Sequence, residues 1–420
     1  MFITLRSLGI NYSAFILLLT AIVIGELGRF HLFGNLYLSL LDLTAVAFLI
    51  ISIKPWQSEL SEVQKKYLFC VFCLFFTMIF TLIVHASTVP LKELLVALLY
   101  PLRWLIISCV PIGVVQLYRD APLRFYIVKE VFGKMLILLA LFGFIQLLLF
   151  PNLGILEQYG FDPHYLRLTS TWLDPNYVGG AFVLGMAVFL SKTKQTRYTI
   201  VSIVILFIAL LCTFSRSSYL FFGVTGVTLA LLRRSWRLGL FVIFGASLLY
   251  LVFAIPRQNL EKSRNIDRYV SASSRIISYS QGMQIFEDSP LIGVGYNLIR
   301  YTKRQYGMIS DIREGGNSGA GIDSSWILIL ATTGILGFIV FLAYWIRIAY
   351  FIVEPVTVKE SHLLKSTFKY INNATSYEHA LLAFLIGWSV HSWFVNSLFF
   401  TPLLALWGIA LGIALSEKLK

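Results

Sequence analysis

Apolar runs of roughly 20 residues recur along the whole chain, a length that crosses a bilayer as a helix, and they constrain the fold more than any other feature. Hydrophobic residues make up 58% of the 420 residues, and charged residues only 13%. A soluble domain of this size carries about 25% charged residues. The sequence therefore predicts an all-α polytopic membrane protein that forms one domain over residues 1–420.

We predict about twelve transmembrane helices, one for each apolar run. The first run is long enough to remain as a span, so we expect no cleaved signal peptide. The predicted spans lie near 11–28, 34–52, 67–86, 91–117, 132–150, 175–191, 198–214, 217–232, 237–255, 323–348, 379–396 and 399–416.

Basic residues gather in alternate connections, and this bias sets the orientation. The other short connections hold only Arg29, Lys92, Arg167 and Arg216. Because cytoplasmic loops carry an excess of Lys and Arg, the richer set, the loop at 354–378 and both termini are predicted to be cytoplasmic. The richer set comprises Arg6, Lys54, Lys65, Lys66, Arg119, Arg124, Lys129, Lys134, Lys192, Lys194, Arg197, Arg233, Arg234, Arg237, Arg347, Lys359, Lys365, Lys369, Lys418 and Lys420.

The longest connection, 256–322, is predicted to be a large periplasmic or extracellular loop. Its apolar residues follow helical spacing from Ile276 to Phe286, which indicates an amphipathic helix on the outer surface or over a cavity. Gly293 and Gly295 follow in a turn, but no strand-turn-helix unit surrounds them, so they do not form a dinucleotide site.

The net charge of +13 is spread over short loops. Cytoplasmic flanks of spans explain this charge better than a nucleic-acid partner does.

Cys70 and Cys73 have CxxC spacing inside an apolar run. We interpret them as small apolar side chains that fill space in the span, rather than as redox or metal-binding residues. The sequence carries no metal signature, and we expect no metal and no cofactor.

Polar residues mark the outer start of the sixth predicted span, in "RLTSTWLDPNYVGG". Asp174 before Pro175 is a good helix cap. Arg167 and Asn176 are less easily explained by capping, and both are candidate substrate-binding residues near the outer interface.

Arg216, Arg275 and Asp323 are the candidate catalytic residues. Arg216 lies in the corner "CTFSRSSYLFFG" between two apolar runs, on the side where arginine is scarce. A lone arginine there can also snorkel to headgroups or bind free helix carbonyls, and Asp323 can also be a simple cap. We expect the three to converge at one outer cleft, which favours function over three separate structural roles.

Arg103 and His391 are further candidates for substrate binding. Arg103 lies about twelve residues into the fourth span, at a depth of roughly 18 Å. A charge there marks a functional path or pairs with a carboxylate such as Asp42 or Glu26. His391 lies near the outer end of the eleventh span and is either a cleft residue or an interfacial histidine.

The order of "WLDPNYVGG", "TFSRSS", "SSRIISYSQGMQIFEDSPLIGVGYN" and "IDSSWILILATTGILG" resembles the O-antigen ligase and polymerase superfamily. The resemblance covers roughly residues 160–345. It implies a GT-C-like fold in the bacterial inner membrane, with a cavity on the periplasmic side. It also implies a glycan donor on undecaprenyl diphosphate and a glycan acceptor, with a chain-length regulator as a further candidate partner. Arg216 and Arg275 would grip the donor diphosphate. At the position of Asp323 the ligases show a histidine that is taken as the general base. An aspartate at this position is more typical of the polymerases.

The residue types suit that chemistry. Guanidinium groups bind phosphate oxygens in a bidentate fork and can offset the charge of a diphosphate leaving group without a metal. A shielded carboxylate can accept the proton of an acceptor hydroxyl. We therefore expect a metal-independent, inverting glycosyltransferase that polymerises the repeat units of O-antigen, capsule or exopolysaccharide. The alternatives are a ligase that transfers glycan to lipid A-core and, in another class, a transporter of polysaccharide or lipid-linked sugar, to which Arg103 lends most support.

Overall fold

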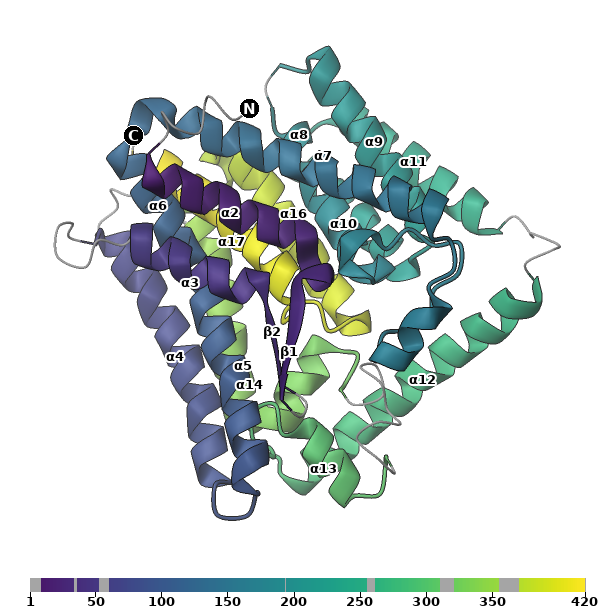
Figure 1. The fold of residues 1–420 in the computed structure, drawn as a ribbon. Helices are drawn as coiled ribbons and strands as arrows, with labels where there is room; N and C mark the ends of the chain where they lie inside the picture. Colours follow the sequence, from purple (N-terminus) through teal and green to yellow (C-terminus); the bar gives the residue numbers. More distant parts are fainter. Residues whose placement is uncertain are drawn as a thin grey trace.

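The computed structural model describes residues 9–33, 36–52, 60–192, 194–254, 261–309, 321–354 and 370–419, and the chain forms a bundle of helices (Figure 1). The helices are α2 (Ile10–Ile24), α3 (Leu40–Ser52), α4 (Glu62–Val84), α5 (Leu91–Ser108), α6 (Val110–Asp120), α7 (Phe125–Leu149), α8 (Pro175–Leu190), α9 (Arg197–Thr213), α10 (Arg216–Leu232), α11 (Trp236–Ala254), α12 (Glu261–Asp288), α13 (Ile299–Gln305), α14 (Ser325–Val353), α16 (Ser376–Phe394) and α17 (Thr401–Glu417). Short 3-10 turns are η1 (Gly25–Gly28), η2 (Pro122–Arg124), η3 (Gly154–Tyr159) and η4 (Ser170–Trp172).

The predicted all-α class is confirmed, with one small exception in the described part of the chain. Strands β1 (Arg29–Phe33) and β2 (Leu36–Ser39) form an antiparallel hairpin in which Arg29 pairs with Ser39. The second predicted span, 34–52, therefore begins with a strand, and its helix starts only at Leu40.

Among the described residues, five helical segments are long and apolar enough to cross a membrane. They are Ile10–Gly28, Glu62–Val84, Leu91–Asp120, Pro122–Leu149 and Ser325–Val353. Six shorter apolar helices cover Leu40–Ser52, Pro175–Leu190, Arg197–Thr213, Arg216–Leu232, Trp236–Leu251 and Thr401–Glu417. The chain is thus a helical membrane protein, and the count of twelve spans stays a prediction.

Helix α17 lies at the centre of the bundle. All its residues from Pro402 to Ser416 are buried, and in Figure 1 it passes behind α2. A helix that is apolar all round lies in a protein core or spans a membrane. The core around it is rich in large rings, including Trp388 and Trp407, whose centroids are 5.8 Å apart.

Polar contacts tie helix ends together at one end of the bundle. Lys418, after α17, pairs with Glu378 of α16 at 3.3 Å, and Lys129 of α7 pairs with Glu417. Asn11 of α2 donates to Asp120 of α6 at 2.6 Å. These residues belong to the ends that the charge bias predicts to be cytoplasmic. Most of the predicted loop 354–378 lies outside the described residues.

At the other end, helix α12 runs along one edge of the molecule toward α13 (Figure 1). It confirms the helix predicted from Ile276 to Phe286 and extends it in both directions. The segment after it fits into a break in α14 at Gly334, where φ is 64° and ψ is −170°. Ile335 N donates to Pro290 O at 2.8 Å, and Val294 N to Ala331 O at 3.1 Å. The break therefore anchors the connection between α12 and α13.

Candidate functional site

The corner that carries Arg216 is built by a helix end and a new cap. Phe214 adopts φ 50° and ψ 31° and ends α9. Ser215 then caps α10 by accepting from Ser218 N at 3.2 Å. Arg216 is the first residue of α10, and its side chain is exposed. A left-handed residue followed by a serine cap lets two apolar helices meet in a tight corner.

Asn176 joins the starts of α8 and α10. Its Oδ1 accepts from Ser215 Oγ at 2.7 Å and from Ser217 Oγ at 3.3 Å, and its carbonyl accepts from Ser218 Oγ at 3.1 Å. Asn176 thus holds the corner beside Arg216 in place. Its predicted contact with a substrate stays a prediction.

Arg167 reaches the same corner from the loop before α8. Its Nε donates to Thr213 O at 2.9 Å, three residues before Arg216. Burial lowers the pKa of Arg167 to about 10, Asp174 and Tyr219 act in the opposite direction, and Arg275 and Arg216 lower it further. Arg216 at the start of α10 and Arg275 of α12 therefore both act electrostatically on Arg167, which lies in a third segment.

Asp323 lies against α12, next to Arg275. Its backbone N–H donates to Ser278 Oγ at 3.1 Å, and Ser278 is one helical turn beyond Arg275 on the same face. Burial raises the pKa of Asp323, Arg275 lowers it, Asp162 raises it and Lys303 lowers it. The backbone of Asp323 thus lies against α12 one helical turn from Arg275, whose charge acts on its carboxyl group.

Asp174 caps α8, as the sequence predicts. Its Oδ1 accepts from Asn176 N at 2.6 Å and from Tyr177 N at 3.2 Å. Burial raises the pKa of Asp174 to about 6, although these amides and Arg167 favour the ionised form. Asp174 therefore adds a second partly buried carboxyl beside the arginines.

His391 lies in the core behind the site and is fully buried. Its Nδ1 is 2.9 Å from Ser397 Oγ, and its ring stacks on Phe221 with centroids 5.0 Å apart. Arg275 acts on it electrostatically. The residue is thus near the arginine cluster, and its role as a binding residue stays a prediction.

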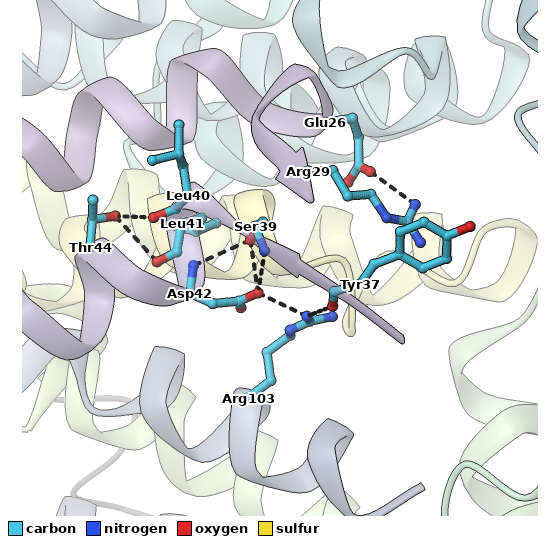
Figure 2. Close-up of polar contacts among 9 residues, drawn as sticks. All are labelled: Glu26, Arg29, Tyr37, Ser39, Leu40, Leu41, Asp42, Thr44 and Arg103. Atoms are coloured by element: carbon cyan, nitrogen blue, oxygen red, sulfur yellow. Dashed lines mark hydrogen bonds and ion pairs between the residues drawn. The ribbon is translucent and has the colours of Figure 1, made fainter. Parts of the chain in front are cut away.

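Arg103 belongs to a different polar network, shown in Figure 2. Its NH2 group donates to Asp42 Oδ2 at 2.8 Å and to Tyr37 O at 2.9 Å. Pairing with Asp42 is one of the alternatives that the sequence leaves open. Beside it, Arg29 pairs with Glu26 at 3.3 Å and lies 4.0 Å above the ring of Tyr37. This network fixes the hairpin to α3 and α5.

Three residues near the site are not among the site residues predicted from the sequence. Asp162 acts on Asp323, His164 lies beside Arg167, and Lys303 acts on Asp323. Burial, with the charge of Arg167, lowers the pKa of His164 to about 3. Asp162 and His164 stand in "FDPH", and its Asp-Pro pair was the signal available for them. No local sequence pattern distinguishes Lys303 from the basic residues near it.

No group of three or more His, Cys, Asp and Glu side chains is arranged to hold a metal ion in the described ranges. The arrangement instead offers three guanidinium groups and a partly buried carboxyl at one end of a bundle. Such groups can bind a phosphate-bearing ligand and accept a proton beside it.

The fold and the site together define a helical membrane protein with a basic site beside a carboxyl group. A family model described as O-Antigen ligase matches residues 201–342, which include Arg216, Arg275 and Asp323. The match confirms the resemblance to the O-antigen ligase and polymerase superfamily. The family implies a glycosyltransferase-like activity on lipid-linked glycans. The search of curated proteins finds no match.

Proposed function

We propose that the protein polymerises undecaprenyl-diphosphate-linked repeat units of O-antigen, capsule or exopolysaccharide. The observation that carries the proposal is that Arg216 and Arg275 both act electrostatically on Arg167, and that Arg275 also acts on the carboxyl group of Asp323. Three cations that repel one another gain most from a polyvalent anion, and a diphosphate is such an anion.

The reaction is a displacement at the sugar C1 atom. The acceptor hydroxyl oxygen attacks C1 on the face opposite the diphosphate, and Asp323 takes the hydroxyl proton. The bond between C1 and the diphosphate oxygen breaks, and the lipid diphosphate leaves with the electron pair. Arg216 and Arg275 bind the diphosphate oxygens as the negative charge on these oxygens grows, so the reaction is metal-independent. Because the hydroxyl attacks from the face opposite the diphosphate, the reaction inverts the anomeric centre.

The site opens to the periplasmic face of the inner membrane, with both termini in the cytoplasm. Two features support this orientation. The basic connections follow the positive-inside rule. Lys418, which pairs with Glu378, also donates to Glu354 O at the end of α14 opposite to Asp323.

A ligase that moves finished glycan to lipid A-core is the second candidate, and the description of the matching family favours it. The aspartate at position 323, where the ligases show a histidine, favours the polymerase. Both reactions use the same donor, and they differ in the acceptor.

The test is transfer by the purified full-length protein in lipid nanodiscs. Given a lipid-diphosphate repeat unit alone, a polymerase yields a ladder of product lengths on a gel. A ligase yields product only when lipid A-core is added, and then a single addition. Product in neither reaction would contradict the proposal.

A further inference from the structure

A buried lysine lies next to the candidate base. Lys303, on α13, is 1% exposed, and an ammonium group is rarely buried without a partner. Its Nζ donates to the carbonyl of Gly321 at 2.6 Å. Gly321 is separated from Asp323 by one residue, so the lysine holds the segment that carries the carboxyl.

Two further anchors fix the same short segment. Ile322 is 2% exposed and packs with Ile285 of α12 and Ile299 of α13. Asp323 N donates to Ser278 Oγ at 3.1 Å. The backbone on both sides of Ile322 is therefore held by hydrogen bonds, and its side chain is held by packing.

Charged and titratable groups of four neighbouring segments interact electrostatically with Asp323. Helix α12 contributes Arg275 and Tyr279, α13 contributes Lys303, the loop before α8 contributes Asp162, and α8 contributes Tyr177. Arg275 and Lys303 favour the ionised carboxyl, whereas burial and Asp162 oppose it.

The relation between the lysine and Asp323 is mutual. Burial lowers the pKa of Lys303 to about 8, and the charge of Asp323 raises it. Each group therefore stabilises the charged form of the other. Arg275 is the second cation near Asp323, but in the proposed function it is engaged by the diphosphate. Lys303 is then the cation that stays with the carboxyl throughout.

We propose that Lys303 is a positioning residue that fixes the Gly321–Asp323 segment and keeps Asp323 ionised for proton transfer. The inference rests on the proposed function, in which Asp323 is the base. It adds a residue from α13 to a site otherwise formed by the loop before α8, α10, α12 and the start of α14.

The test measures the protonation of Asp323 directly, without relying on activity. Infrared difference spectra of the full-length protein in nanodiscs, recorded against Asp323→Asn across pH, report its carboxyl band. Lys303→Met is expected to raise the titration midpoint of Asp323 by about one pH unit. Lys303→Arg keeps the charge and should leave the midpoint within about 0.3 unit of wild type. Arg304→Met, at the exposed neighbouring position, is the matched control and should leave it unchanged.

An unchanged midpoint in folded Lys303→Met would overturn the inference. If that variant does not yield folded protein, Lys303→Gln, which keeps a donor for Gly321 O without the charge, should show the same rise, and an unchanged midpoint there overturns the inference equally. In active protein, the acid limb of the pH–rate profile should move with the midpoint. Wild-type protein that transfers no glycan would contradict the proposed function, while the titration would still decide the role of Lys303.

Discussion

At the scale of single residues, the arginines of the site are costly for the free protein. Burial lowers the pKa of Arg167 most, and the positive charges of Arg275 and Arg216 lower it further, while Asp174 and Tyr219 act in the opposite direction. Such repulsion lowers the free energy of unfolding unless an anion offsets it. In the proposed function, the diphosphate of the donor is the anion that offsets this cost.

Removing these side chains should reduce transfer far more than it affects folding. We expect Arg216→Ala, Arg275→Ala and Asp323→Ala each to lower the rate by about 10²-fold or more, the usual effect of losing one group that stabilises a transition state. The measurement is polymer yield per folded protein. Arg237→Ala, an exposed arginine in the first turn of α11, is the matched control and should stay near wild type. Wild-type polymer from all three variants would remove the assignment of the site.

The raised pKa of Asp174 predicts how the stability of the folded protein changes with pH. Its pKa is about 6, above the ordinary 3.8, so the folded state binds the proton more tightly than the unfolded state. The contribution of Asp174 to stability is thus full below the ordinary pKa and is lost as pH rises through about 6. Asp174→Asn keeps an acceptor for the cap but carries no charge. Its melting temperature should match wild type near pH 4 and exceed it by about 2 °C near pH 7.5.

A second variant separates the cap from the charge. Asp174→Ala removes the acceptor for Asn176 N and Tyr177 N and should be about 1 kcal/mol less stable than Asp174→Asn at every pH. Thermal unfolding in detergent measures both variants. If Asp174→Asn were less stable than wild type near pH 7.5, ion pairing of Asp174 with Arg167 would outweigh its burial, and the predicted sign would be wrong.

At the scale of elements, the broken helix α14 is the part most dependent on glycine. The backbone conformation at Gly334 is open almost only to glycine, and a Cβ there would lie 2.3 Å from the backbone of Leu291. Gly334→Ala should therefore lower the free energy of unfolding by more than about 2 kcal/mol. Thermal unfolding and size-exclusion chromatography measure the loss.

The control for this substitution is another glycine inside a helix. A Cβ at Gly223 of α10 would meet nothing within 4 Å, and alanine favours a helix over glycine by about 1 kcal/mol. Gly223→Ala should be as stable as wild type or more stable. Equal melting temperatures for the two alanine variants would show that the segment after α12 does not depend on the break in α14.

Local signals in the sequence were sufficient for most elements and insufficient for two. The helical spacing from Ile276 to Phe286 correctly predicts part of α12. The predicted span 91–117 is divided into α5 and α6 at Cys109, because Pro111 cannot donate the helical hydrogen bond that would continue the helix. The hairpin was missed although its strands flank Gly34 and Asn35, a pair typical of hairpin turns.

At the scale of the whole molecule, the sequence could indicate which residues are unusual but not all of those that meet. Arg216, Arg275 and Asp323 stand out because each interrupts an apolar or amphipathic pattern. Lys303 and Asp162 do not, and they approach Asp323 only because distant segments pack at the same end of the bundle. Such neighbours are set by tertiary packing, which a single sequence does not encode in any local pattern.

The two ends of the bundle should face different compartments, and this can be tested by cysteine labelling. Tyr159, 67% exposed at the end of η3, lies in the connection that carries Arg167. Leu123, 93% exposed in η2, lies in the connection that leads to Lys129, at the end where Lys129 and Lys418 form ion pairs. We expect an impermeant maleimide to label Tyr159→Cys in cells with a permeabilised outer membrane. It should reach Leu123→Cys only after the inner membrane is disrupted.

The labelling needs a background without the native thiols Cys70, Cys73, Cys109 and Cys212, all of which are partly exposed. That background, unlabelled and still producing polymer, is the control. Labelling of Leu123→Cys alone in cells with an intact inner membrane would place the arginine cluster in the cytoplasm. A lipid-linked glycan presented at the periplasmic face would then not reach Arg216 and Arg275. The proposed reaction would fail on topology, even if each side chain had the assigned chemistry.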